Sequence, residues 1–180
     1  MAILTKSRLA ELTENRFGTA TFSATLNENI RKSETGSGTK IFLSHSHADA
    51  DKIEVRRITV MLRKVNANVY IDRNDSGLPP TTGADTALRL KRQIKTSEKF
   101  ILVATNNAIA SKWCNWDLGH GDAYKFPDHI AIIPLAEHDG QWTGQEYLNI
   151  YPRIEESDVN PGRYKIVYPD DSIKYLENWL

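Results

Sequence analysis

The stretch Lys40-Ile-Phe-Leu-Ser-His-Ser-His-Ala-Asp49 decides the fold of this chain. It opens with a continuous apolar run at residues 41–43, passes through a polar loop and ends at Asp49, which with Asp51 is a candidate cap for a following helix. A helix to about residue 65 is expected because apolar side chains recur at intervals of three and four residues. These side chains are Ile58, Met61, Leu62 and Val65. An apolar strand that leads through a loop into an amphipathic helix is the repeating unit of a parallel α/β sheet.

The same unit recurs along the rest of the chain. Further apolar runs lie at residues 69–71, 100–103, 130–134 and 165–168, and Pro134 is expected to end its strand. Amphipathic patterns predict a helix over residues 84–96 and a closing helix that begins at residues 170–172. The sequence therefore predicts the α/β class, with a five-stranded parallel sheet in a doubly wound, flavodoxin-like order and helices on both faces.

Composition narrows the class of protein. The 180 residues suffice for one domain with a sizeable core, and 23 Lys and Arg balance 23 Asp and Glu, so no nucleic-acid or membrane partner is expected. No apolar stretch reaches the length of about 18 residues that a spanning helix needs, and the N-terminus has no apolar leader. The single cysteine, Cys114, excludes an internal disulfide and fits a reducing compartment, so a cytoplasmic location is expected.

The first 37 residues differ in composition from the remainder. They are polar, contain one weakly helical segment at residues 7–15 and end in the linker-like run Ser33-Glu-Thr-Gly-Ser-Gly38. We therefore expect an N-terminal extension and linker at residues 1–37 and one folded domain at residues 38–180.

Ligands of doubly wound sheets bind beyond the carboxyl ends of the strands. This rule selects residues 44–49, 72–83 and 105–117 as the rim of a site. Within it, Asp72-Arg-Asn-Asp-Ser-Gly-Leu-Pro-Pro80 is a long loop in which Gly77 permits positive φ and the prolines stiffen the exit. Such a loop is typical of a functional lid, with a plain surface connection as the alternative.

The segment Ser111-Lys-Trp-Cys-Asn-Trp-Asp-Leu118 lies on the same rim. Trp113 and Asp117 are four residues apart, so on a helix an aromatic plate and a carboxylate can address one ligand. Such a pair can stack a planar ring and stabilise positive charge that develops beside it. The alternative is a core Trp and a solvated Asp near a helix start.

The His45-Ser-His-Ala-Asp49 run has two interpretations. It partly matches the His-x-His-x-Asp-His zinc motif, but Ala50 stands at the last ligand position and no other histidine has ligand-like spacing, so no metal is predicted. The favoured interpretation is a polar loop in which Ser44, His45 and backbone N–H groups receive phosphate or ribose hydroxyls. Helix capping by Asp49 or Asp51 is compatible with this role.

Taken together, five segments resemble TIR (Toll/interleukin-1 receptor) domains, specifically the bacterial kind found in antiphage systems such as Thoeris. The segments are Lys40-Ile-Phe-Leu-Ser-His-Ser-His-Ala-Asp49, Val69-Tyr-Ile-Asp72 with its Gly/Pro loop, the helix that ends in Ile94-Lys-Thr-Ser97, Ser111-Lys-Trp-Cys-Asn-Trp-Asp-Leu118, and Gly144-Gln-Glu-Tyr-Leu-Asn-Ile-Tyr-Pro152 with the closing Asn178-Trp-Leu180. They occur in the family's order over residues 40–180.

The resemblance implies an enzyme that cleaves the nicotinamide–ribose bond of NAD⁺ and makes a nucleotide signal. The family's catalytic Glu falls at Asp117, and its nicotinamide-stacking aromatic falls at Trp113. Ser44, His45, Asp72 and Gly77 are expected to line the nucleotide cleft. Family members often self-associate on activation, so a homo-oligomer is expected, together with an effector protein that reads the product.

The departure from the family is Asp117 itself. Its carboxylate lies about 1.5 Å farther back than that of a Glu, the length of one C–C bond, and a misplacement of about 1 Å can cost on the order of 100-fold in rate. The alternative function is therefore a TIR interaction module with little or no catalysis. A third hypothesis is a nucleotide glycosyl-transferring enzyme of related fold, which the order of motifs fits less well.

Overall fold

A computed structural model describes residues 3–17, 37–49, 53–72, 83–137, 140 and 142–180. One sheet runs through the molecule in the order β3-β2-β4-β5-β6-β7-β8, and β1 also pairs with β5. The strands are β1 (Leu4–Thr5), β2 (Thr39–Ser44), β3 (Ala67–Tyr70), β4 (Lys99–Ala104), β5 (Ile130–Ala136), β6 (Arg153–Glu156), β7 (Tyr164–Val167) and β8 (Ile173–Tyr175). The helices are α1 (Lys6–Phe17), α3 (Ile53–Lys64), α4 (Ala84–Thr96), α5 (Asn106–Ala110), α6 (Lys112–Lys125) and α7 (Leu176–Trp179), with short 3-10 helices η2 (His47–Asp49) and η4 (Glu146–Ile150).

The centre of the sheet confirms the predicted fold class. Strands β3, β2, β4 and β5 are parallel neighbours, which gives the flavodoxin-like order for the first four predicted strands. The predicted count of five strands is wrong, because the described residues form eight. The fifth predicted strand, β7, is antiparallel to β6, and β6 itself joins β5 through the pair Ile132 and Arg153.

The predicted closing helix is also wrong at its start. Asp170 does not cap a helix there; its carboxylate accepts hydrogen bonds from the backbone N–H and the hydroxyl of Ser172. With Asp171 at φ 62°, this closes a tight turn into β8, which pairs antiparallel with β7. Only α7 remains helical. Likewise Pro134 lies inside β5 rather than at its end, and Leu135 goes on to pair with β1.

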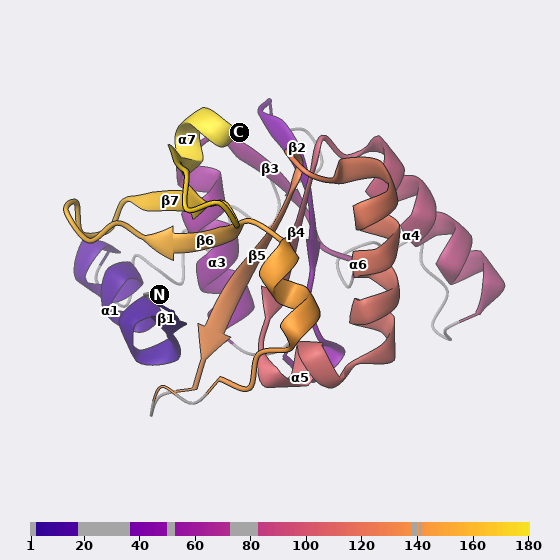
Figure 1. The fold of residues 1–180 in the computed structure, drawn as a ribbon, viewed down its shortest axis with the longest axis horizontal. Coiled ribbons are helices and arrows are strands. Elements are labelled where there is room, and N and C mark those ends of the chain that lie inside the picture. Colours follow the sequence, from indigo (N-terminus) through magenta and orange to yellow (C-terminus); the bar gives the residue numbers. More distant parts are fainter. Residues whose placement is uncertain (1–2, 18–36, 50–52, 73–82, 138–139, 141) are drawn as a thin grey trace.

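The sheet lies between two helical layers, each with its own core (Figure 1). Alternate strand residues such as Ile41 and Leu43 pack with α1, α3 and α7, while Phe42 and Phe100 pack with α4, α5 and α6. This alternation buries both faces, as the continuous apolar runs predict. The face under α6 carries the site described below.

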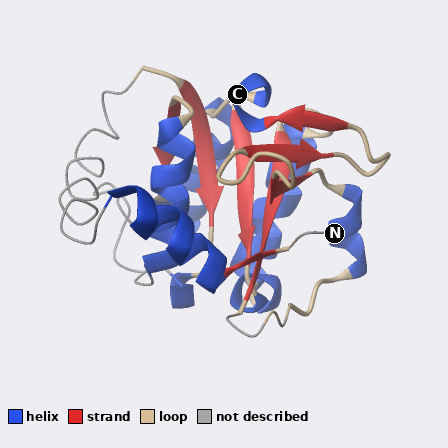
Figure 2. Cartoon of the chain, turned by 90° about the vertical axis from the view of Figure 1, so that its left-hand side faces the viewer, coloured by secondary structure: helices blue, strands red, loops and turns tan. Residues whose placement is uncertain are grey.

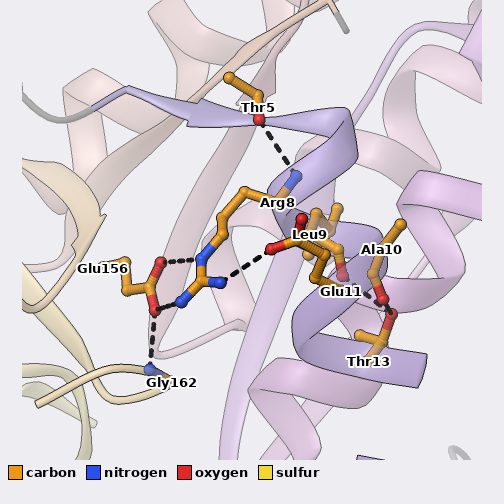
Figure 3. Close-up of polar contacts among 8 residues, drawn as sticks. All are labelled: Thr5, Arg8, Leu9, Ala10, Glu11, Thr13, Glu156 and Gly162. Carbon is orange, nitrogen blue, oxygen red and sulfur yellow. Dashed lines mark hydrogen bonds and ion pairs between the residues drawn. The ribbon is translucent and has the colours of Figure 1, made fainter. Parts of the chain in front are cut away.

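The N-terminal arm, residues 3–17, pairs with the end of β5 and packs against α3. The helical segment predicted near residues 7–15 is confirmed as part of α1, and Figure 2, seen from the side of that helix, shows it in front of the sheet. Leu4 and Leu9 are buried in the core. The Arg8 guanidinium donates two hydrogen bonds of 2.9 Å to Glu156, whose carboxylate also accepts from the backbone of Gly162 (Figure 3). The domain boundary at residue 38 remains a prediction.

Candidate functional site

Helix α6 carries Asp117 close to the carboxyl edge of the sheet. The helix begins after Ser111, whose hydroxyl accepts a hydrogen bond from the backbone N–H of Cys114. Farther along, Gly121 lets the helix approach β4, since a Cβ at this position would lie 2.8 Å from the Phe100 ring. This close contact holds the buried face of α6, which includes Cys114 and Asp117, against the sheet.

Asp117 is the buried acid of the site. Its side chain is 9% exposed, and its Oδ2 accepts a hydrogen bond of 3.1 Å from the hydroxyl of Ser44, the last residue of β2. Its Oδ1 has no hydrogen-bond partner among the described residues. Burial raises the pKa of the Asp117 carboxyl to about 7; Asp72 adds to the rise, whereas the Ser44 hydrogen bond and His47 oppose it. A buried carboxyl group with one anchored and one unpartnered oxygen and a raised pKa is a candidate for chemistry rather than a satisfied structural group.

Cys114 lies beside this acid but stays a thiol. It is buried, and burial raises its pKa to about 11, with the Asp117 charge adding to the rise. A thiol with such a raised pKa is a poor nucleophile near neutral pH. Cys114 is therefore a small buried side chain and not a nucleophile.

Trp113 lies on the exposed flank of α6, with 44% of its surface accessible. Its ring meets that of Trp116 edge-on, with centroids 5.4 Å apart and planes at 75°. Trp116 in turn packs against the His120 ring at 4.7 Å. Trp116 therefore packs against Trp113. No pattern in the sequence pointed to this residue. The face of Trp113 that a ligand ring needs is not buried in the core, contrary to the alternative of a core Trp.

His45 and His47 turn toward Asp72, which lies two residues after the end of β3. His47 Nε2 lies 2.9 Å from Asp72 Oδ2, and His45 Nδ1 lies 4.0 Å from Asp72 Oδ1. Burial lowers the pKa of His45, and the Asp72 charge partly offsets this. His45 is therefore neutral near pH 7, whereas His47 is exposed to solvent. Sequence reasoning did not assign a role to His47, although its two-residue spacing from His45 placed it on the same rim.

Asp49 anchors the loop after β2 to the segment that follows β4. Its carboxylate accepts hydrogen bonds from the Thr105 hydroxyl, at 2.5 Å, and from the Asn107 amide, at 2.8 Å. The same Thr105 hydroxyl caps α5. The loop that carries Ser44 to Asp49 is thus tied to the end of β4.

The loop after β5 closes another side of the rim. The Trp142 indole N–H donates to the backbone carbonyl of Ala104, at 2.6 Å. Thr143 donates through its N–H and its hydroxyl to the Asn106 side chain. No local sequence pattern predicts these contacts, because they join residues 37 or more positions apart.

Two predicted rim features lie outside the described residues, namely Gly77 with its loop and Asp51. Within the described ranges, no group of three or more His, Cys, Asp and Glu side chains is placed to hold a metal ion. No helix in the described part of the chain is long and apolar enough to cross a membrane.

The rim therefore unites Ser44, His45, Asp72 and Asp117, with Trp113 on its outer flank. Comparison with known proteins identifies the family of the chain. The model of the TIR domain matches residues 41–159, from β2 to the segment after β6. A relative from Bacillus cereus (strain MSX-D12), a probable 3' cyclic ADP-D-ribose synthase ThsB', is 29% identical over 147 residues, which are 78% of this chain and 74% of the relative. Because the family match spans more than half of its residues, the chain belongs to the TIR domain family.

Proposed function

We propose that this protein cleaves the bond between nicotinamide and ribose in NAD⁺ and releases an ADP-ribose-derived nucleotide signal. The observation that carries the proposal is Asp117, a buried carboxyl group with one oxygen anchored by Ser44 and the other unpartnered among the described residues. Structural carboxylates are normally satisfied, and an acid whose pKa is strongly raised in a rim position is a candidate for chemistry.

Breaking the N-glycosidic bond builds positive charge on the ribose ring. A carboxylate that accepts hydrogen bonds from the ribose hydroxyls stabilises this charge more in the transition state than in the bound substrate. We assign this role to Asp117 Oδ1. Nicotinamide is planar, and Trp113 offers it an exposed aromatic face one helical turn away. Ser44, His45, Asp72 and Gly77 are assigned to the nucleotide cleft.

Two structural features compensate for the shorter side chain of Asp117. Gly121 brings α6 close to β4, and the Ser44 hydroxyl reaches the acid directly from β2. A closely packed helix offsets part of the methylene that separates Asp from the family's Glu. The close packing at Gly121 and the Ser44 hydrogen bond support a working acid at position 117 rather than an interaction module alone.

The probable 3' cyclic ADP-D-ribose synthase among the relatives supports a cyclic or otherwise conjugated product. Water as the acceptor would give linear ADP-ribose, and a hydroxyl of the substrate itself would give a cyclic one. By analogy with the family, we place the protein in the cytoplasm and in bacterial antiphage defence, where it self-associates on activation and signals to an effector protein.

The test is incubation of the concentrated, purified protein with NAD⁺, followed by liquid chromatography and mass spectrometry. Parallel samples contain a crowding agent or lysate from phage-infected cells, since assembly is expected to activate the enzyme. Release of nicotinamide with one ADP-ribose-derived product is the expected result. NAD⁺ that stays intact under all these conditions would favour the interaction module.

A further inference from the structure

A second acidic residue, Asp72, lies at the same end of the sheet as Asp117. Strand β3 ends at Tyr70 and strand β2 at Ser44, and the parallel register pairs Phe42 with Tyr70. Asp72 follows Tyr70 by two residues, as Ser44 follows Phe42, so both residues lie at the carboxyl ends of neighbouring strands. Ser44 is the residue that contacts Asp117, so two carboxyl groups border one loop end.

The electrostatics agree with this placement. The charges of Asp72 and His47 both act on the Asp117 carboxyl, the first raising its pKa and the second lowering it. Asp72 also acts on the Cys114 thiol next to Asp117. The two carboxyl groups therefore lie near enough to each other for their charges to interact.

The imidazole rings of His45 and His47 lie beside the Asp72 carboxylate. Its Oδ2 lies 2.9 Å from His47 Nε2, and its Oδ1 faces His45 Nδ1 at the longer distance of 4.0 Å. The side chain of Asp72 is 17% exposed, while that of His47 is 76% exposed. The pair therefore joins a half-buried carboxylate to a solvent-facing imidazole, which is the arrangement of a base that passes a proton outward.

We propose that Asp72, supported by His47, is the general base that activates the hydroxyl acceptor in ADP-ribosyl transfer. The inference rests on the proposed function and gives it a second acid–base residue. The C1′–N bond breaks with both electrons going to the pyridinium nitrogen, and neutral nicotinamide leaves. A lone pair of the acceptor oxygen forms the new C1′–O bond, and the proton of that hydroxyl passes to Asp72 and on to water through His47.

The two acids therefore have different roles in the reaction. Asp117 stabilises charge on the ribose and is needed whatever the acceptor is. Asp72 is needed only where the acceptor must lose a proton, as water and ribose hydroxyls must. A pyridine acceptor attacks through its nitrogen lone pair and loses no proton, so it makes no use of a base.

The experiment compares two reactions in each variant of the full chain. The first is formation of O-linked products from NAD⁺, linear and cyclic together. The second is exchange of nicotinamide for 3-acetylpyridine, read by mass spectrometry of the new dinucleotide. Asp72→Asn is expected to lower the first reaction at least about 100-fold more than the second, because loss of a cleft residue weakens both reactions whereas loss of the base affects the first alone. Asp117→Asn is expected to lower both, and His47→Gln to lower the first about tenfold.

Asp158→Asn is the matched control, since Asp158 contacts Lys165 on an exposed turn away from the cleft, and it is expected to change neither reaction. Retained exchange in Asp72→Asn also shows that this variant is folded. Equal loss of both reactions in Asp72→Asn, or no loss of O-linked products, would overturn the inference while leaving the proposed function intact. A wild-type protein that performs neither reaction contradicts the proposed function, and the inference with it.

Discussion

The Ser44–Asp117 hydrogen bond is the contact on which the site depends at the scale of single residues. It holds a buried carboxyl group whose pKa lies at about 7, so the group gains or loses its proton within the physiological range. The resemblance to the family pointed to Asp117 and Ser44 separately. Their contact was not predictable, because it joins residues 73 positions apart and depends on how closely α6 packs.

The ionised form of Asp117 is the one that stabilises a cation, so kcat/KM is expected to rise as pH rises through about 7. The Ser44 hydrogen bond lowers the pKa of this carboxyl, and Ser44→Ala removes it. We expect the midpoint of the pH–rate profile to move to higher pH in Ser44→Ala, together with a lower maximal rate. Ser97→Ala, which removes an equally buried hydroxyl far from the acid, should leave the midpoint in place. A midpoint that is unchanged or lower in Ser44→Ala would contradict the assignment.

Helix α6 is the element that sets the position of the acid. Its two glycines have different surroundings: a Cβ at Gly121 would lie 2.8 Å from the Phe100 ring, whereas a Cβ at Gly119 would meet nothing within 4 Å. Gly121→Ala is expected to push α6 off β4 and reduce kcat/KM about 10-fold to 100-fold, because the carboxylate moves with the helix. Gly119→Ala is the matched control. It should keep its activity and gain up to about 1 kcal/mol of stability from helix propensity. Steady-state kinetics and thermal unfolding measure both, and similar activities for the two variants would argue against the close packing of α6.

At the scale of elements, a strand was predictable from the sequence when both of its faces are buried. The central strands β2, β4 and β5 are covered on both faces, so they are continuous apolar runs and were predictable. Strands β6 and β8 are short and carry charged residues, Arg-Ile-Glu-Glu and Ile-Lys-Tyr, so they gave no periodic signal. The turn before β8 was mistaken for a helix start because Asp and Ser serve in both.

At the scale of the whole molecule, the N-terminal arm extends the end of β5 with a short parallel strand and completes one core. Leu4 and Leu9 enter the core of α3 and the central strands, while Lys6 and Arg8 form ion pairs with Glu137 and Glu156. Composition alone suggested an appendage, because the buried residues of the arm are few and widely spaced. What ties the arm down is contact with strands more than 130 positions away along the chain.

Leu9→Ala tests the contribution of the arm to stability. Leu9 is fully buried, so the variant is expected to lose about 2–5 kcal/mol of unfolding free energy and about 5–15 °C in Tm. Leu88→Ala, at a position 61% exposed on α4, is the control and should change Tm by no more than about 2 °C. Thermal unfolding followed by circular dichroism gives both values. A Tm in Leu9→Ala equal to that of the wild type would mean that the arm does not hold its place in solution.

The central claim is that the Asp117 carboxylate drives cleavage of NAD⁺, and nicotinamide release by three proteins tests it most directly. The wild type, Asp117→Asn and Asp117→Glu are compared at pH 8, where the carboxyl group of the wild type is ionised. We predict that Asp117→Asn, which keeps the shape but removes the charge, loses activity by at least about 100-fold. Asp117→Glu, which restores the family's acid, is predicted to retain turnover. Release of nicotinamide by Asp117→Asn at the wild-type rate would contradict the account.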